Sequence, residues 1–390
     1  MKNLNLIWTM ILLVMAGCGQ RQAGNDDFIT VDVTKTDYPK KELILQDFMD
    51  VEYVPLETKE GFYNRGVVNF VGEKFILVTN SRNGDIFIYG RDGKAIQKIN
   101  RKGQGPEEYI SINAGIILDE DNNEILSNDL FNRRILVYDL RGNFKRSFKQ
   151  KVATDHEEFY TNIFNYDKGN LICYNEYNEK IPFLIVSKQD GSITKEIEIP
   201  YEKKKFLRQI KDGETPGSAT VVFPGRHRSM IPHKGNWILI ELSSDTVYTM
   251  LPDYSLHPFL VRSPSIQSMD PEIFLTLHLI SDSYLFMEAT KNEYNWETRN
   301  GFPKTYMMYD RQEKAMRNYT IFNGDYSIKK EMYMSATTPV NHEIESWYPL
   351  EAYKLVESYN KGELKGKLKE IAATLNEESN PVIMLIKHKK

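Results

Sequence analysis

The sequence predicts an all-β fold, a six-bladed β-propeller of four-stranded antiparallel blades, with one or two C-terminal helices packed on it. Three observations support this prediction. Hairpin-like segments recur at a spacing of 49 residues, further strand-like runs lie between them, and the repeats lack the amphipathic period of solenoid helices. The chain of 390 residues also exceeds the size at which one compact core keeps growing, which favours a repeat architecture.

Residues 1–17 have the features of a signal peptide. An apolar run from Leu6 to Met15 is followed by two small residues and then by Cys18. About ten apolar residues are too few for a membrane-spanning helix, which needs about twenty. The Met-Ala-Gly-Cys stretch resembles a bacterial lipobox, which predicts that Cys18 is lipidated and becomes the first mature residue. The alternative is an ordinary cleaved signal peptide followed by an unmodified cysteine.

The mature chain is expected to have two parts. Residues 18–27 are almost entirely polar and predict a flexible tether, and residues 28–390 form the propeller domain. Because two or three acyl chains together anchor a protein stably, we expect a lipid-anchored protein of the cell outer membrane, with the membrane as a partner. The side of the membrane that the body faces is left open.

Composition limits the partners and the covalent framework. The formal net charge of −4 gives no global basic field, so nucleic acid is not an expected partner. The chain has two cysteines, and lipidation of Cys18 leaves Cys173 without an intramolecular partner. No disulfide framework is therefore expected, and Cys173 is interpreted as a small apolar residue within a strand.

The repeat is clearest in three consecutive copies. Segments 84–99, 133–148 and 182–197 align without a gap, and each reads as an apolar strand, a polar turn with glycine and a second strand. Looser copies at 244–261 and 305–321 keep the strands but lack the glycine. A hairpin plus another strand pair in each repeat is the content of one blade. Since the later copies carry longer loops, six blades are favoured.

The stretch RKGQGPEEY, residues 101–109, is interpreted as a connection between blades. Gly103 and Gly105 allow backbone angles closed to other residues, and Pro106 fixes a bend while donating no hydrogen bond. The chain can thus pass from the outer strand of one blade to the innermost strand of the next. A phosphate-binding turn is not favoured, because the lysine and the following helix of a P-loop are missing.

The ends of the chain are expected to close the ring, because an open ring would expose a sheet edge. Val382–Ile386 forms a fully apolar strand and residues 28–33 form another, so either terminus is a candidate for a shared blade. Apolar residues at helical spacing between 364 and 375 predict one C-terminal helix, and the segment after Pro349 predicts a second.

Four segments carry a family resemblance: the GQGPEEY turn, the ILVYDLRGNF hairpin, the LQDFMDVEYVPLET segment and the LNEESNPVIMLIKHK ending. Together they resemble the six-bladed β-propeller lipoproteins of Bacteroides and relatives, which are related to NHL-repeat propellers. The resemblance covers nearly the whole mature chain, although the family usually has glycine where this chain has Glu107. It implies the fold, but it supplies no catalytic residues, since most such proteins have no assigned activity.

Two loops hold the candidate ligand-binding residues. Arg226, His227 and Arg228 lie in a long connection, where planar guanidinium groups suit a carboxylate or sulfate and an acidic sugar is a conceivable ligand. The alternative is a salt-bridged surface loop. Tyr294 and Trp296 lie in another long loop, where aromatic faces could stack on sugar rings or peptides. The alternative there is aromatic packing beneath the loop.

Local catalytic and metal motifs are missing from the sequence. The seven histidines show no zinc-helix spacing, and residues 119–124 begin like a calcium loop without its glycine and final glutamate. Neither a nucleophile elbow nor a dinucleotide fingerprint occurs. No cofactor and no metal ligand is therefore assigned, while a site assembled from separate blades around the axis stays open.

These observations favour a binding or scaffold protein of the outer envelope whose axial face recognises a glycan, a peptide or a partner protein. The alternative is a metal-dependent hydrolase, lactonase or lyase with its site at the propeller axis, so catalysis is left undecided. A component of an envelope assembly without a small ligand is a third interpretation.

Overall fold

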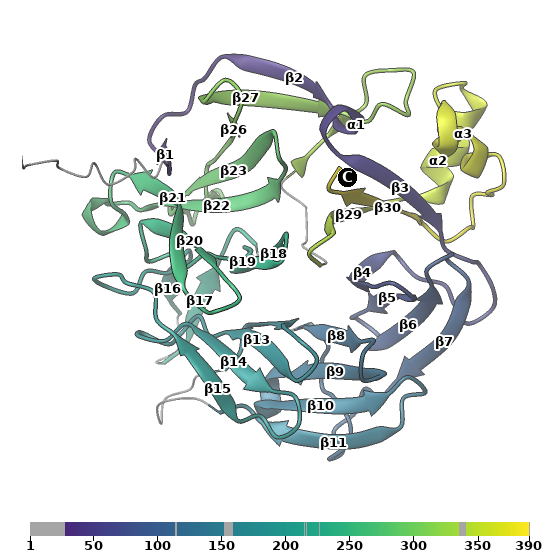
Figure 1. Ribbon diagram of the computed structural model, residues 1–390, viewed down its shortest axis with the longest axis horizontal. Helices are drawn as coiled ribbons and strands as arrows, with labels where there is room; N and C mark the ends of the chain where they lie inside the picture. The colour runs from purple at the N-terminus through teal and green to yellow at the C-terminus, as the bar shows by residue number, and fades with distance from the viewer. Residues whose placement is uncertain are drawn as a thin grey trace, which may run out of the picture.

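The computed structural model describes residues 28–113, 115–151, 159–213, 215, 217–225, 227–334 and 341–389. Six blades stand around a central axis (Figure 1), which confirms the predicted all-β, six-bladed propeller. Blades 1 to 5 each contain four antiparallel strands, and the closing blade 6 is formed by three. The signal peptide, Cys18 and the tether lie outside the described residues.

The first three blades follow one another along the chain. Blade 1 consists of β4 (Val67–Val71), β5 (Phe75–Asn80), β6 (Asp85–Gly90) and β7 (Ala95–Asn100). Blade 2 consists of β8 (Ile116–Asp119), β9 (Glu124–Asp129), β10 (Arg134–Asp139) and β11 (Phe144–Lys149). Blade 3 consists of β12 (Asn162–Asn165), β13 (Asn170–Tyr174), β14 (Phe183–Ser187) and β15 (Ile193–Ile197). The three aligned repeats are the outer hairpins of these blades.

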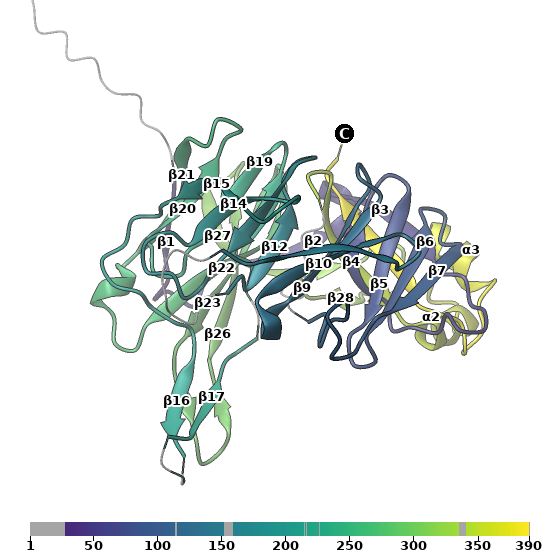
Figure 2. The ribbon, with the colours of Figure 1, turned by 90° about the horizontal axis from the view of Figure 1, so that it is seen from below.

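Two further blades carry insertions. Blade 4 consists of β18 (Met230–His233), β19 (Asn236–Leu239), β20 (Thr246–Met250) and β21 (Leu256–Ser263). Blade 5 consists of β22 (Ile273–Ile280), β23 (Tyr284–Lys291), β26 (Lys304–Asp310) and β27 (Ala315–Phe322), with β28 (Glu331–Met332) paired to β27. The hairpin of β16 (Gln209–Asp212) and β17 (Ala219–Val222) precedes blade 4 and projects from one face (Figure 2). A shorter hairpin, β24 (Tyr294–Asn295) and β25 (Asn300–Gly301), is inserted in blade 5.

The closing blade joins the two ends of the chain. Its strands are β29 (Ile344–Leu350), β30 (Val382–Lys387) and β3 (Asp50–Pro55), with β30 in the middle. The C-terminal strand therefore completes a shared blade, as expected. Its N-terminal partner is β3, and residues 28–33, the other candidate for a shared blade, do not belong to this sheet. The physical reason is connectivity, because the strand that closes the ring must lead directly into the innermost strand of blade 1.

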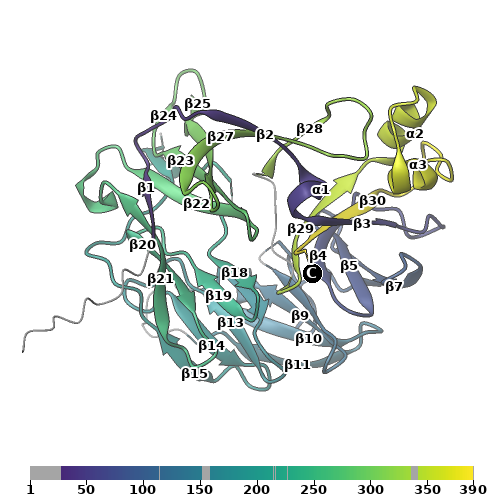
Figure 3. The ribbon, with the colours of Figure 1, turned by 45° about the horizontal axis from the view of Figure 1, so that its top comes forward.

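The N-terminal segment instead runs along the outside of two blades. Strand β1 (Ile29–Asp32) pairs in parallel with β21, and β2 (Lys40–Ile44) pairs in parallel with β27. Each adds a further strand to the outer edge of a blade, as Figure 3 shows along the rim. Val31 is fully buried, so this segment also contributes to the core. The outer edges of β21 and β27 are thereby paired, and the short strands β1 and β2 become the edges of these blades.

The helices lie where the C-terminal pattern predicts them. Helices α2 (Ala352–Asn360) and α3 (Gly366–Ala372) lie between β29 and β30, and a short α1 (Leu45–Phe48) precedes β3. Leu355 and Leu368 pack into a core that they share with Met384 of β30. This confirms the prediction of C-terminal helices packed on the propeller. In the described part of the chain, no helix is long and apolar enough to cross a membrane.

The 101–109 stretch has the predicted position between β7 and β8. Tyr109 is fully buried, and its hydroxyl donates to the carbonyl oxygen of Gly84 at 2.7 Å. Arg134 of the next blade donates to the carbonyl oxygens of Pro106 at 2.6 Å and Glu108 at 2.8 Å. The stretch therefore connects two blades and also fastens them to each other.

A buried ion pair makes a second link between neighbouring blades. The Lys188 ammonium lies 2.6 Å from Asp119, and the side chains are 3% and 0% exposed. The same ammonium donates to the carbonyl oxygen of Asp167 at 2.6 Å. Cys173 lies nearby in the core between blades 2 and 3 and is fully buried, which confirms its interpretation as an apolar strand residue.

At the hairpin turn of blade 2, glycine is required by both conformation and space. Gly142 has a φ of 86°, and a Cβ at this position would lie 2.7 Å from Ile99 of the preceding blade. Gly235 has a φ of 79°, but a Cβ there would meet nothing within 4 Å. Substitutions at these two positions therefore distinguish the free-energy cost of a left-handed backbone from the cost of steric crowding.

We expect Gly142→Ala to lower the free energy of unfolding by about 2–4 kcal/mol, since backbone strain and overpacking act together. Gly235→Ala is the matched control and should cost about 1 kcal/mol, from the backbone alone. Urea unfolding of both variants measures the difference. Equal losses would show that the approach of the turn to Ile99 does not constrain the blades.

Replacing Lys188 with alanine should destabilise the protein by about 3 kcal/mol, because Asp119 is left as a buried carboxylate without its ammonium partner. The control is Lys94→Ala, which removes an ammonium 79% exposed and 3.4 Å from Asp92. That variant should change stability by less than about 1 kcal/mol. A similar small effect for both variants in urea unfolding would refute a structural role for the buried pair.

Candidate functional site

The candidate site is a cavity of about 460 Å³ on the propeller axis. Its wall comes from the innermost strands β4, β8, β12, β18 and β29, so five blades contribute to it. Such a volume is typical of small-molecule sites, which lie in the range of about 300–1,000 Å³. The side chains that line the cavity fall into an aromatic group, an amide group and a basic group.

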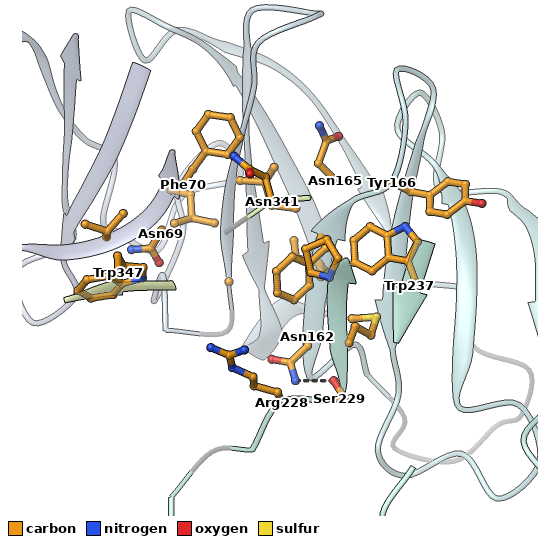
Figure 4. Close-up of a pocket in the computed structure, with 18 of the residues that line it drawn as sticks. Asn69, Phe70, Asn162, Asn165, Tyr166, Arg228, Ser229, Trp237, Asn341 and Trp347 are labelled. Carbon is orange, nitrogen blue, oxygen red and sulfur yellow. Dashed lines mark hydrogen bonds between the residues drawn. The ribbon is translucent and has the colours of Figure 1, made fainter. Parts of the chain in front are cut away.

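The aromatic group forms two facing walls (Figure 4). Phe70 and Trp347 lie on one wall, and Tyr166 and Trp237 lie on the opposite one. The ring centroids of Tyr166 and Trp237 are 6.1 Å apart at an interplanar angle of 30°. Phe164 meets Trp237 edge-on, with centroids 5.9 Å apart, and holds the indole in place. Flat apolar surfaces thus lie on both sides of the cavity.

The amide group lies between the two walls. The Asn69 side-chain nitrogen donates to Thr79 at 2.7 Å, and that of Asn162 donates to Ser229 at 3.0 Å. The side-chain oxygen of Asn165 is buried and accepts no hydrogen bond within the described part of the chain. An enclosed acceptor of this kind is costly unless a ligand or water donates to it.

Not every amide at the cavity is available to a ligand. Asn341 donates from its nitrogen to the carbonyl oxygen of Val71 at 2.6 Å and accepts from the backbone nitrogen of Ile344 at 2.7 Å. This residue therefore ties the start of β29 to β4. Its role is to position the wall.

The basic group comes from the segment that leads into β18. His227 and Arg228 both line the cavity, and the ligand-binding role that the sequence analysis gave them stays a prediction. Arg228 donates from Nη1 to the carbonyl oxygen of His278 at 2.5 Å. Burial lowers the pKa of His227 to about 4, so this imidazole is neutral at pH 7. The third predicted residue of this loop, Arg226, lies outside the described residues.

A second, small cavity of about 60 Å³ adjoins this basic end and shares His227 and Arg228 with the axial cavity. It also contains Glu288 and Lys304, whose charged atoms are 3.0 Å apart. Burial alone would raise the pKa of Glu288, but His278, Thr290 and Lys304 lower it to about 2. The Glu288 carboxylate is therefore ionised and compensated by its neighbours.

The opposite end opens into a third cavity of about 470 Å³ with a charged rim. Several charges at this rim are already engaged within the protein. Arg91 forms two hydrogen bonds with Glu52, at 2.7 and 3.0 Å, and Lys387 lies 3.2 Å from the same carboxylate. Glu120 accepts from the backbone nitrogens of Lys74 at 3.0 Å and Phe75 at 2.9 Å.

The other predicted pair lies away from the axis. Tyr294 and Trp296 belong to the β24–β25 segment, which Figure 3 shows at the rim, and neither lines the axial cavity. Their centroids are 4.9 Å apart, Tyr294 lies 5.7 Å from Phe302, and the Lys211 ammonium is 5.9 Å from the Trp296 ring. The structure therefore does not bring this pair together with His227 and Arg228.

Several cavity residues were missed by the sequence analysis. Asn162 begins β12 and Tyr166 directly follows it, whereas Trp347 lies on β29, far away in the chain, and no local motif joins them. The available signal was the presence of asparagine at both ends of the short strand 162–165, where an inner strand would otherwise be apolar. Within the described residues, no group of three or more His, Cys, Asp or Glu side chains is placed to hold a metal ion.

Comparisons with solved structures support the fold. The "Putative exported protein" of Bacteroides fragilis NCTC 9343 is 18% identical, with a TM-score of 0.54, over 93% of this chain and 100% of that one. A DUF4221 member from Bacteroides vulgatus is 12% identical, with a TM-score of 0.44, over 72% and 90% of the two chains. An inactive virginiamycin B lyase from Staphylococcus aureus is 10% identical, with a TM-score of 0.35, over 87% and 99%. At this identity, the first match supports the fold alone. The likeness to the other two structures is too distant to support any conclusion about this chain.

Comparison with curated proteins finds no match. A family model does match, and it covers residues 28–387, which is the propeller in full from β1 to β30. Its description assigns no activity. The chain belongs to the family described as "Domain of unknown function (DUF4934)".

Proposed function

We propose that the protein is an exported, lipid-anchored binding protein whose axial cavity takes a saccharide. The observation that carries the proposal is the lining of the cavity, in which aromatic faces stand on two sides and amides lie between them. Sugars offer apolar ring faces and many hydroxyl groups, so such a lining satisfies both parts of a sugar. The relationship to NHL-repeat propellers belongs to this proposal and is supported by the 49-residue hairpin repeat.

The amides favour a ligand that donates hydrogen bonds. The nitrogens of Asn69 and Asn162 already donate within the protein, which leaves their oxygens as acceptors. Together with the unpartnered oxygen of Asn165, these groups suit hydroxyl donors. A hydroxyl-rich ligand would thus satisfy the Asn165 oxygen, which the described residues leave without a partner.

Binding is favoured over hydrolysis by the chemistry of the same lining. Glycoside hydrolysis usually requires a pair of carboxyl groups on either side of the scissile bond. The described residues that line the axial cavity include neither aspartate nor glutamate. The nearest alternative, a metal-dependent hydrolase, lactonase or lyase, has no observation at this cavity in its favour.

The ligand-binding residues predicted from sequence divide between two places. His227 and Arg228 belong to the proposed cavity, and Arg226 is proposed to act with them. Tyr294 and Trp296 are proposed as a separate contact surface for a larger glycan, a peptide or a partner protein. The spacing of these two rings, 4.9 Å between centroids, supports a shared aromatic contact.

We expect the purified propeller to bind saccharides on a glycan array and Asn165→Ala to weaken binding about fivefold in calorimetry. The reason is the loss of one hydrogen bond from a ligand hydroxyl, which is worth about 1 kcal/mol. Asn83→Ala, in the exposed turn between β5 and β6, is the matched control and should bind like the parent. A folded protein that binds no saccharide on the array would refute the proposal.

Lipidation of Cys18 is proposed on the lipobox-like stretch that precedes it. Mass spectrometry of the membrane fraction should find a mature chain that begins at residue 18 and carries acyl chains. Cys18→Ser should move the protein out of the membrane fraction, because the thiol that accepts the lipid is missing. A parent protein that is recovered free of lipid, with its first residue elsewhere, would contradict this part of the proposal.

A further inference from the structure

We infer that the binding site continues beyond the axial cavity, and that Tyr254 forms an outer subsite for a further sugar unit. The inference rests on the proposed function, because it names the class of saccharide. An oligosaccharide would place one unit in the cavity and the following units along the rings of Tyr166 and Tyr254.

The first support is the position of Tyr254 in the hairpin turn between β20 and β21. In the corresponding turn of blade 2, the backbone nitrogen of Gly142 donates to the carbonyl oxygen of Asp139 at 3.0 Å, and Gly142 has a φ of 86°. In blade 4, the backbone nitrogen of Tyr254 donates to the carbonyl oxygen of Leu251 at 2.9 Å, and Tyr254 has a φ of 67°. Tyrosine thus stands in blade 4 where blade 2 has its turn glycine.

This choice of residue has a conformational cost. A left-handed backbone brings the Cβ of an L-residue too close to the following carbonyl oxygen, and a bulky residue at positive φ is an outlier. Glycine would close the turn without that cost. Backbone strain of this kind occurs preferentially at ligand sites, where the side chain and not the turn explains the residue.

The second support is a row of three aromatic rings that leads outward from the cavity. Tyr166 lies next to Trp237, with centroids 6.1 Å apart at an interplanar angle of 30°. Tyr254 continues the row, since its centroid lies 6.0 Å from that of Tyr166 at an interplanar angle of 21°. Figure 4 shows Tyr166 beyond Trp237, with its hydroxyl turned away from the cavity. The strained turn therefore adds a ring to the aromatic wall of the proposed site.

The third support is the accessibility of this row. Tyr166 and Tyr254 are both half-buried, so part of each side chain can contact a ligand. At the outer end, the ammonium of the exposed residue Lys195 lies 5.7 Å from the centroid of the Tyr254 ring. An ammonium group there can donate hydrogen bonds to sugar hydroxyls. Aromatic surface and a polar donor are thus combined outside the cavity as well as within it.

The test measures binding of sugar oligomers of one to four units by calorimetry. The probes are the maltose series, the cellobiose series and the same lengths of the saccharide that binds best on the glycan array. We expect the trisaccharide of at least one series to bind about tenfold more tightly than its monosaccharide. Tyr254→Gly should weaken binding of that trisaccharide about fivefold, since one aromatic contact is worth about 1 kcal/mol, and should leave the monosaccharide unaffected.

Tyr254→Gly should also keep or raise the urea concentration at the midpoint of unfolding, because glycine suits the turn. The matched control is Lys314→Gly, which changes another residue of positive φ, 48°, in the corresponding turn of blade 5. That variant should bind every length like the parent. Tyr254→Phe should keep most of the gain with length, and Tyr254→Leu should lose it, since leucine fills space without a flat ring.

The outcomes separate the inference from the proposed function. Saccharide binding that does not strengthen with length, or a gain that survives both Tyr254→Gly and Tyr254→Leu, overturns the inference and leaves the proposed function standing. A gain that Tyr254→Leu keeps and Tyr254→Gly loses makes Tyr254 a packing residue, which also overturns the inference. Binding of no probe, together with an empty glycan array, overturns both.

Discussion

The structure depends on the pairing of β30 with β3, which closes the ring. All residues from Val382 to Ile386 are buried, so this strand requires a neighbour on each side. Strand β29 supplies one neighbour and β3 the other, and their registers extend along the full length of β30. Without this contact the first and last blades would separate, and the five inner strands would no longer surround one cavity.

Closure also explains why the cavity can be polar. Each blade holds its own hydrophobic contacts with its neighbours, in six buried clusters around the ring. The innermost strands therefore do not need to form a hydrophobic core along the axis. Asparagine and histidine can occupy positions on these strands without disrupting the packing between blades. Links such as Arg134 to the 101–109 stretch and Lys188 to Asp119 fix neighbouring blades, which keeps the cavity walls in place.

Much of the fold could be predicted because its signals are local. Positive φ at Gly93, Gly142 and Gly191 marks the turn of each aligned hairpin, and these glycines recur every 49 residues in the sequence. The partner of the C-terminal strand could not be chosen by apolarity, since residues 28–33 and β3 both look like strands. Only the path of the chain into blade 1 decides between them, and this is a property of the closed ring.

The candidate site could be predicted in part, for a related reason. His227 and Arg228 were visible because charge is concentrated in one segment, whereas Trp347 and Asn162 meet only when blades 6 and 3 face each other. The lining of the cavity is thus a property of the closed ring, and the sequence could reveal it only where one segment concentrates several residues of a kind.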